Sequence, residues 1–314
     1  GGNSDSVKVL LNEINKLSAH LKKKPADVAT QMSLLHSLRN LGNLMLVEGV
    51  VKAKAAGEVA KTAVHSTNIV ERAMVPGPAK SDLLTSTMQI LGRAALIAGA
   101  NIDSDKAIKS VLAVIRANPN DDKLLESAMY ALGNLVNSPD AVRALVANGG
   151  IELLEKTINE SAENERLRDA AVKALEKLRN AAAAGAGELA SDPAGANALA
   201  EVIKAHSNDP AALRDLLREI AAGPTGLHDL LAILGSDGFK TASPETRTAL
   251  LRALREQLER SGNELAVTGA SDMAGLLASL DESTDGLTKQ EKEAVLERQK
   301  EALNLLALLS GASA

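Results

Sequence analysis

The sequence predicts an all-α protein built from stacked helical hairpins. Hydrophobic residues make up 45% of the 314 positions, but they are almost all Leu, Ala, Val and Ile. The chain has no Trp, and Tyr130 and Phe239 are its only aromatic residues. Ala and Leu favour closely packed helices, whereas strands favour aromatic and β-branched residues. Apolar residues also recur with a helical period along the whole chain.

The recurrent unit is an apolar helix, a polar or Pro-containing turn and a second apolar helix. Copies of this unit cover residues 9–41, 69–96, 107–135, 151–178, 198–220, 227–254 and 273–309. Their mean spacing is about 44 residues, which is in the range typical of helical repeats. Such a unit cannot bury its apolar face alone, so the sequence predicts that at least six hairpins stack side by side.

The turns carry residues that end one helix and cap the next. Clear examples are 118–121 (NPND), 208–210 (NDP) and 243–245 (SPE). Asn, Asp and Ser accept hydrogen bonds from the free amides of a helix N-terminus, and Pro fits its first turn. Ser138 and Pro139 likewise predict the start of a short helix, which 148–150 (NGG) ends because Gly adopts left-handed conformations readily.

One segment shows a longer ordered pattern, YALGNLVNSPDAVRALVANGGIELLEKTINESAENERLRDAAVKALEKL, over residues 130–178. A helix ending in ALGNL is followed by the short helix, Asn-Gly-Gly and two more helices. This order resembles one armadillo repeat read through to the next. The resemblance is specific for residues 104–180; elsewhere the helix pattern is similar to HEAT repeats. It implies a right-handed α-solenoid of armadillo/HEAT-like hairpins with a binding surface.

The resemblance also implies a peptide groove. In armadillo proteins, an Asn on the third helix of each repeat bonds to an extended peptide on the concave face. Tyr130 and Asn134 match this signature, with Tyr in place of the Trp that lies four residues before the Asn in some members of the family. The equivalent positions in the other copies are Asn43, Arg93, Lys177, Glu219 and Glu256. Because no Trp is present, a groove for nuclear-localisation signals is not expected.

The charges at these positions predict the chemistry of the partner. Arg93 and Lys177 would make the central groove basic and favour an acidic or phosphorylated segment. Glu219 and Glu256 would reverse the sign further along. Replacing Tyr130 and Asn134 by Ala is then expected to weaken binding without changing thermal stability. The alternative interpretation is that these positions hold ordinary polar residues with no ligand.

The array divides into three parts. Residues 1–180 are expected to form armadillo-like repeats, with an extra Ala/Gly-rich helix inserted at 47–64. Residues 181–198 are low in complexity and have two interpretations, a helix that runs on from Leu178 or a flexible joint; a loop with partial helix is expected. Residues 199–314 are expected to form HEAT-like repeats and a cap, with a charged, solvent-facing segment at 289–303. Gly42, Gly92 and Gly133 lie within helices, which predicts close approach of a neighbouring helix.

No cofactor or catalytic site is expected. The chain has no Cys, so it has no disulfide, thiolate metal site or Cys nucleophile. The five His residues show no zinc-binding spacing. The GxGxxA sequence at 185–190 follows a helix rather than the strand that a dinucleotide site needs. No nucleophile, base and oxyanion donor can be recognised together.

Composition also limits the partners and the compartment. No run of about 18 apolar residues is present, which excludes a membrane span. The net charge is −5, residues 22–24 are the only basic run, and aromatic residues for stacking are missing, all of which argues against nucleic acid. Without Cys or a signal-peptide pattern, the chain is expected in the cytoplasm, with the nucleus also open.

Three functions are compatible with this pattern. The leading hypothesis is a non-enzymatic scaffold or adaptor that binds an extended peptide or a helix on its concave face. The second is an engineered helical repeat protein with no biological ligand, which the lack of Cys and the high Ala and Leu content favour. Irregular repeat lengths and the turn at 75–78 (VPGP) argue against an idealised design. The third is an enzyme on a helical fold.

Overall fold

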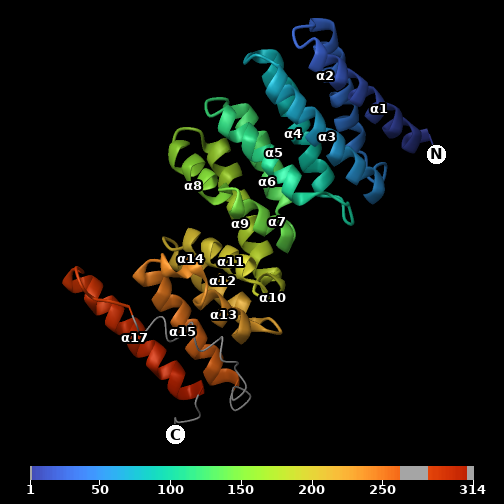
Figure 1. The fold of residues 1–314 in the computed structure, drawn as a ribbon. Helices are drawn as coiled ribbons and strands as arrows, with labels where there is room; N and C mark the ends of the chain where they lie inside the picture. The colour runs from blue at the N-terminus through green and yellow to red at the C-terminus, as the bar shows by residue number, and fades with distance from the viewer. Residues whose placement is uncertain (1, 262–281, 310–314) are drawn as a thin grey trace. The chain divides into compact units, whose positions relative to one another are not determined.

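All regular elements in the described part of the chain are α-helices (Figure 1). The structure is a computed structural model that describes residues 2–261 and 282–309. Its contacts divide the chain into two compact units, Gly1–Leu178 and Arg179–Ala314. The all-α class is therefore confirmed for these residues. The first helix of the last expected hairpin, at 273–281, lies outside the described residues.

The first unit is a stack of helical hairpins. Its helices are α1 (Gly2–Lys23), α2 (Val28–Met45), α3 (Ala53–Ala73), α4 (Pro78–Ala95), α5 (Ser104–Ala117), α6 (Asp122–Leu135), α7 (Pro139–Ala147), α8 (Gly150–Glu160) and α9 (Glu165–Ala184). Helix α1 packs against α2, α3 against α4, and α5 against α6. The unit boundary falls within α9, after Leu178.

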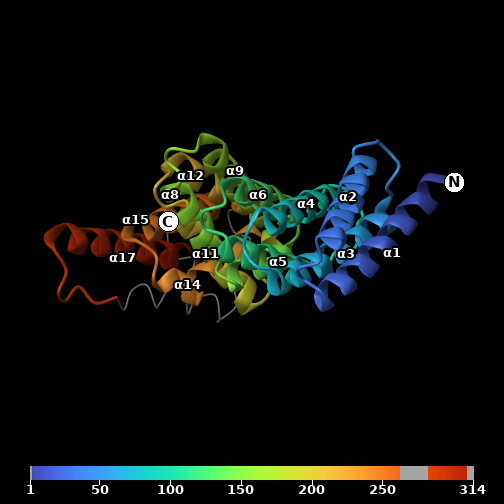
Figure 2. The same cartoon turned by 90° about the horizontal axis from the view of Figure 1, so that it is seen from above.

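The hairpins form two rows. Helices α2, α4 and α6 contact one another in one row, and α1, α3 and α5 in the other (Figure 2). Helix α9 continues the first row, because Gly133 of α6 lies against Ala174 of α9. We call α2, α4, α6 and α9 the ladder row.

The core lies between the two rows and follows the helical period. In α4, Leu84, Met88 and Leu91 are fully buried at a spacing of one turn. Polar groups at this depth are paired, as with the hydroxyls of Ser18 and Ser66, which lie 2.8 Å apart. Burying one large aliphatic side chain stabilises the fold by about 1.5–3 kcal/mol. Because each row packs on the other, no hairpin can bury these faces alone.

The structure confirms the predicted helix caps. Asp121 Oδ1 accepts from the Leu124 amide at 3.2 Å, and Asp209 Oδ1 accepts from the Ala212 amide at 3.1 Å. Ser243 Oγ accepts from the Thr246 amide at 3.2 Å, and Ser138 Oγ accepts from the Ala141 amide at 3.2 Å. Gly149 has φ 73°, the left-handed conformation expected for it.

The structure does not contain the separate inserted helix expected at 47–64. Residues 47–52 form a turn, and α3 then runs without a break from Ala53 to Ala73. The turn after α2 matches the turn after α4, fifty positions later. Leu46 and Leu96 both have φ −78° and ψ −16°, and Gly49 and Gly99 have φ 77° and 79°. The left-handed Gly stops the helix where composition alone suggests that it continues.

The stretch 181–198, for which a loop with partial helix is expected, is mostly helical. Helix α9 extends to Ala184, α10 covers Ala186–Leu189, and α11 begins at Pro193. Ala182, Ala186 and Leu189 are buried. Burial of these small apolar side chains favours the helix over a solvated loop, and Ala itself has the highest helix propensity.

The second unit completes the described chain. Its helices are α10 (Ala186–Leu189), α11 (Pro193–Ala205), α12 (Pro210–Ala222), α13 (Gly226–Leu234), α14 (Asp237–Lys240), α15 (Pro244–Ser261) and α17 (Lys289–Leu309). Helix α11 packs against α13 and α14, α12 packs against α13 and α15, and α15 packs against α17.

The charged face expected at 289–303 is partly buried. Arg298 is 2% exposed, and its Nη2 lies 2.7 Å from Glu282 Oε1. Glu301 is 4% exposed, and its Oε1 lies 3.1 Å from Arg255 Nη1. Helix α17 therefore turns some charges inward, where each has an opposite charge to offset desolvation. The amphipathic pattern could not distinguish these residues from solvated ones.

We expect Gly92→Ala to lower the free energy of unfolding by about 1–3 kcal/mol through overpacking. A β-carbon there would lie 2.5 Å from the Tyr130 ring and 3.2 Å from Ala131 Cα. The ring can rotate away, but the backbone of α6 cannot. Chemical denaturation measures the effect, and Gly133→Leu tests the next interface in the same way.

Gly223→Ala is the matched control, because its nearest atom would be an ordinary 3.4 Å away and its φ of −69° suits Ala. We expect a change within about 0.5 kcal/mol. Equal stabilities of the Gly92 and Gly223 variants would show that α4 and α6 can separate without cost.

Candidate functional site

The predicted groove residues of the first unit form a ladder between successive helices. Arg93 Nη1 on α4 donates to Gly42 O on α2 at 2.8 Å. Asn134 Nδ2 on α6 donates to Gly92 O on α4 at 3.1 Å. Each side chain thus reaches back to the glycine carbonyl of the preceding helix in the ladder row.

These carbonyls lack a partner in their own helix. The last carbonyls of an α-helix have no intrahelical amide to accept from. The Leu46 amide bonds to Asn43 O, which leaves Gly42 O for Arg93. A positive charge at a helix C-terminus also interacts favourably with the helix dipole, by about 0.3–1 kcal/mol. The ladder residues therefore cap the preceding helix.

Asn134 is turned toward its neighbours rather than toward solvent. Its side chain is 3% exposed, and its Oδ1 accepts a hydrogen bond from Lys177 Nζ on α9. Three residues further on, Asn137 Nδ2 donates to Ala95 O at 3.3 Å. The Asn134 side chain therefore already has hydrogen-bond partners on both α4 and α9. Sequence reasoning missed Asn137, which lies two residues beyond the end of α6.

Tyr130, Arg93 and Lys177 remain available to a partner. Tyr130 is 39% exposed, and its ring lies over Gly92, next to Arg93. Lys177 is half-buried; burial and the charge of Lys173 lower the pKa of its ammonium group. No ion pair within the described residues involves Arg93, Lys173 or Lys177. We call Arg93, Tyr130, Lys173 and Lys177 the ladder face.

Of the remaining predicted positions, Asn43 lies in the first unit and Glu219 and Glu256 lie in the second. Asn43 lies exposed at the end of α2, and α2 has no earlier ladder-row helix to cap within the described chain. Glu219 on α12 and Glu256 on α15 are exposed in the second unit. Glu256 lines a cleft there that also carries Arg214, Arg218 and Arg252. The sign reversal expected at this end is therefore not what that cleft presents.

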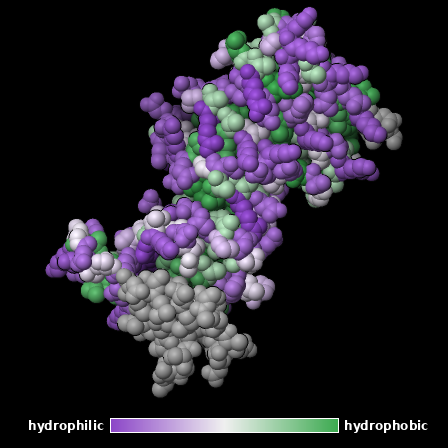
Figure 3. Space-filling view, in the orientation of Figure 1, coloured by the Kyte–Doolittle hydropathy of each residue, from purple (hydrophilic) through white to green (hydrophobic). Residues whose placement is uncertain are grey.

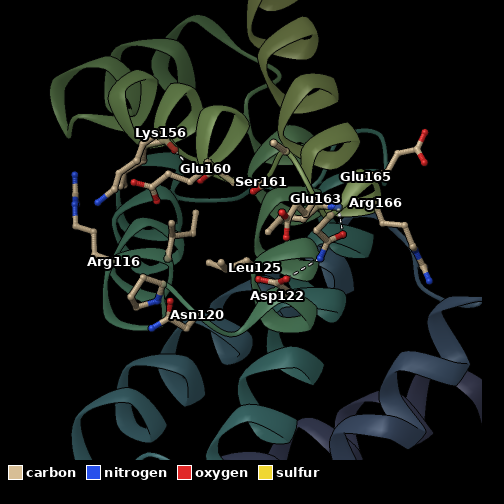
Figure 4. A pocket seen from close by; sticks show the side chains of 17 residues that line it. Arg116, Asn120, Asp122, Leu125, Lys156, Glu160, Ser161, Glu163, Glu165 and Arg166 are labelled. Atoms are coloured by element: carbon tan, nitrogen blue, oxygen red, sulfur yellow. Dashed lines mark hydrogen bonds between the residues drawn. The ribbon is translucent and has the colours of Figure 1, made fainter.

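A second cleft, of about 920 Å³, lies in the first unit where α5, α6, α8 and α9 meet (Figure 4). Leu125, Leu153 and Leu167 contribute an apolar floor. Arg116 and Lys156 lie together at one side of the view, and Glu163 and Arg166 at the other. The sequence contained no motif for this cleft, because its residues come from four helices and two turns.

Several polar and charged side chains of this cleft already have partners within the protein. Asn164 Nδ2 donates to Asp122 Oδ2 at 2.8 Å, and Arg166 pairs with Glu126 at 3.2 Å. Arg116 Nη2 donates to Asn148 O at 2.5 Å. The lining holds three positive residues, Arg116, Lys156 and Arg166, and four negative ones, so the cleft has no dominant sign. It offers shape but little electrostatic selectivity for a charged ligand.

Exposed hydrophobic residues in the first unit are scattered. On the face shown in Figure 3, hydrophilic residues dominate and hydrophobic ones form separate small patches. Val75 is 82% exposed in the α3–α4 turn, and the exposed Leu46 and Leu96 are the C-cap residues that follow α2 and α4. Single exposed aliphatic residues are ordinary on soluble proteins. On this face, selectivity would come from charge and hydrogen bonding rather than from an apolar patch.

No protein-family model matches the chain, and no curated protein matches it. A search of solved structures finds the nuclear import adaptor Nro1 of S. pombe, at 12% identity and a TM-score of 0.30, with 99% of this chain and 100% of that chain covered. A computationally designed self-assembling cyclic homo-oligomer matches at 13% identity and a TM-score of 0.17, with 99% of both chains covered. Likenesses this low carry no argument about function, and the armadillo resemblance stays a prediction.

Two buried ionisable residues of the described chain, His206 and Asp229, have shifted pKa values. No three His, Asp or Glu side chains gather there to hold a metal ion. Among the described helices, none is both long and apolar enough to span a membrane. His206 is buried and its Nδ1 donates to Val202 O at 2.8 Å, and burial lowers the pKa of its imidazole. The hydrogen bond from His206 to Val202 stabilises the fold.

Asp229 is the other buried group with a shifted pKa. It is 2% exposed, and burial raises the pKa of its carboxyl above the ordinary value. Its oxygens lie 3.0 and 3.1 Å from Thr225 Oγ1, and that hydroxyl can donate only one hydrogen. When the Asp229 carboxyl is ionised, Thr225 can therefore donate only one hydrogen bond to offset the cost of burying the charge.

We expect Asn134→Ala to lower the free energy of unfolding by about 1–3 kcal/mol, because Gly92 O would lose its donor. This differs from the expectation, drawn from the sequence, that replacing Asn134 leaves stability unchanged. Asn43→Ala is the control, since Asn43 is exposed at the equivalent position of α2. Thermal melting of both variants measures the difference, and equal melting temperatures would contradict the capping role.

We expect Asp229→Asn to stabilise the protein at neutral pH. A carboxyl whose folded pKa is raised favours folding at low pH, and this contribution is lost as pH rises through the folded pKa. The amide stays neutral, so the gain in the variant should grow as pH rises through the folded pKa of Asp229 and then level off. Denaturation at several pH values measures it. A constant difference at all pH values would show that ionisation plays no part.

Proposed function

We propose that this chain is a protein-interaction scaffold whose ladder face binds an extended acidic segment of a partner. The observation that carries the proposal is the continuous arrangement of Arg93, Tyr130 and Lys177 on three adjacent helices. The Tyr130 ring packs on Gly92, next to Arg93, and Lys177 bonds to Asn134, one turn from Tyr130. Arg93 on α4 and Lys177 on α9 have no ion pair among the described residues, and they lie on the two helices that flank the helix carrying this partly exposed ring.

This combination suits a carboxylate or a phosphorylated side chain. Charge-assisted hydrogen bonds from Arg and Lys are about twice as strong as neutral ones. The Tyr130 ring adds apolar contact area and a hydroxyl, a pairing that recurs at protein interfaces. The two ladder contacts hold Arg93 and Lys177 in place, which lowers the entropy lost on binding.

The proposal extends to architecture and location. It includes an armadillo/HEAT-like, right-handed solenoid in which the ladder face lines the concave side. The stacked hairpins in two rows support this arrangement. It also includes a non-enzymatic role in the cytoplasm or nucleus.

Selection from a library of random extended peptides against the intact protein tests the proposal. We expect the selected peptides to be rich in Asp and Glu. Binding of one such peptide, measured by fluorescence anisotropy, should weaken at least tenfold in Tyr130→Ala with Lys177→Ala, a loss of about 1.4 kcal/mol or more.

Lys61→Ala is the matched control, because Lys61 is an exposed residue on α3 in the opposite row. Neutral or basic selected peptides, or unchanged affinity in the double variant, would contradict the proposal. If no peptide binds above background, the alternative of a helical protein without a ligand on this face is favoured.

A further inference from the structure

The second unit contains a cleft of about 440 Å³ between α12 and α15. Leu213 and Leu217 of α12 form its floor, and both are almost fully buried. Ala249 and Ala253 of α15 line the opposite side and are half-buried. Their small side chains leave room above the floor for side chains of another molecule.

The cleft has the dimensions of a helix-binding groove. Its lining on α12 runs along one stripe from Pro210 to Ala221, and on α15 along one stripe from Glu245 to Glu256. At 1.5 Å per residue, each stripe is about 16 Å long, which matches about three helical turns. Amphipathic helices commonly bind in such grooves through side chains one turn apart.

Three arginines surround this apolar floor. Arg214 and Arg218 lie one turn apart on α12, and Arg252 lies on α15. All three are exposed, and no ion pair among the described residues involves any of them. Glu245 and Glu256 lie at opposite ends of the α15 stripe, so the middle of the cleft is positive.

This local sign is opposite to that of the chain, whose net charge is −5. Two other arginines of the unit share one carboxylate: Arg247 Nη1 lies 2.9 Å from Glu282 Oε1, and Arg298 pairs with the same oxygen. The three arginines around the apolar cleft make no such ion pair and outnumber the two glutamates that line it, so they form a site complementary to negative charge.

We infer that the α12–α15 cleft binds an acidic amphipathic helix of a partner protein. Apolar side chains of that helix fill the space over Leu213 and Leu217. Its carboxylates, spaced one turn apart, bond to Arg214 and Arg218, and a carboxylate on its other flank bonds to Arg252. The planar guanidinium group of Arg matches a carboxylate with two parallel hydrogen bonds. This site lies within the second unit and does not depend on the ladder face.

Two synthetic helical peptides test this inference. Both carry Leu along one stripe; one carries Glu on both flanks and the other carries Lys at the same positions. Fluorescence anisotropy with the full chain should show binding of the Glu peptide and none of the Lys peptide. Arg214→Glu with Arg218→Glu should weaken binding of the Glu peptide at least tenfold. Ala253→Leu, which fills the cleft without changing charge, should weaken it too.

Control variants distinguish this cleft from the other basic surfaces of the chain. Arg168→Glu, at an exposed arginine of α9, and Tyr130→Ala with Lys177→Ala, on the ladder face, should leave the affinity unchanged. Circular dichroism should show native helix content in every variant. Equal binding of the Lys peptide, or unchanged affinity in the Arg214 and Arg218 variant, would overturn the inference. Equally tight binding of single-stranded oligothymidine that depends on the same arginines would also overturn it, in favour of a polyanion surface.

Discussion

The close approach of successive ladder-row helices is the constraint on which the first unit depends. Each approach requires a glycine on one helix, because a β-carbon at Gly92 would overlap the Tyr130 ring. The same approach brings the next helix near enough for Arg93 and Asn134 to reach glycine carbonyls. The close approach thus packs two helices together and also lets a side chain of one helix cap the C-terminal end of the other. Moving the two helices apart would lose both the dispersion contacts and the hydrogen bond between them.

This arrangement divides the ladder residues between stability and recognition. Asn134 uses its hydrogen-bonding capacity within the protein, whereas Tyr130 keeps an exposed ring and Lys177 keeps part of its side chain in solvent. A residue that matches a binding motif can therefore be structural while its neighbour one turn away is accessible. In the second unit, the same division separates the buried Arg298 from the exposed arginines of the α12–α15 cleft.

Local interactions explain which features could be predicted. The caps at Asp121, Asp209 and Ser243 depend on groups within three residues, and the sequence therefore predicted them. The boundary near 47–64 depended on the left-handed Gly49, which composition cannot distinguish from a helical glycine. The end of α9 at Ala182 and the start of α10 at Ala186 depended on burial, which a low-complexity stretch does not reveal.

The sequence by itself determined the helical class, the hairpin spacing and the helix caps at Asp121, Ser138, Asp209 and Ser243, because period, propensity and capping act over one or two turns. It also indicated that Gly42, Gly92 and Gly133 face a close neighbour. Only the tertiary structure decided where polar side chains point. Asn134 is buried because α4 and α9 lie on either side of it, and the α12–α15 cleft is positive because three arginines from two helices converge there. Such placement depends on contacts between residues far apart in the chain, which helical periodicity does not encode.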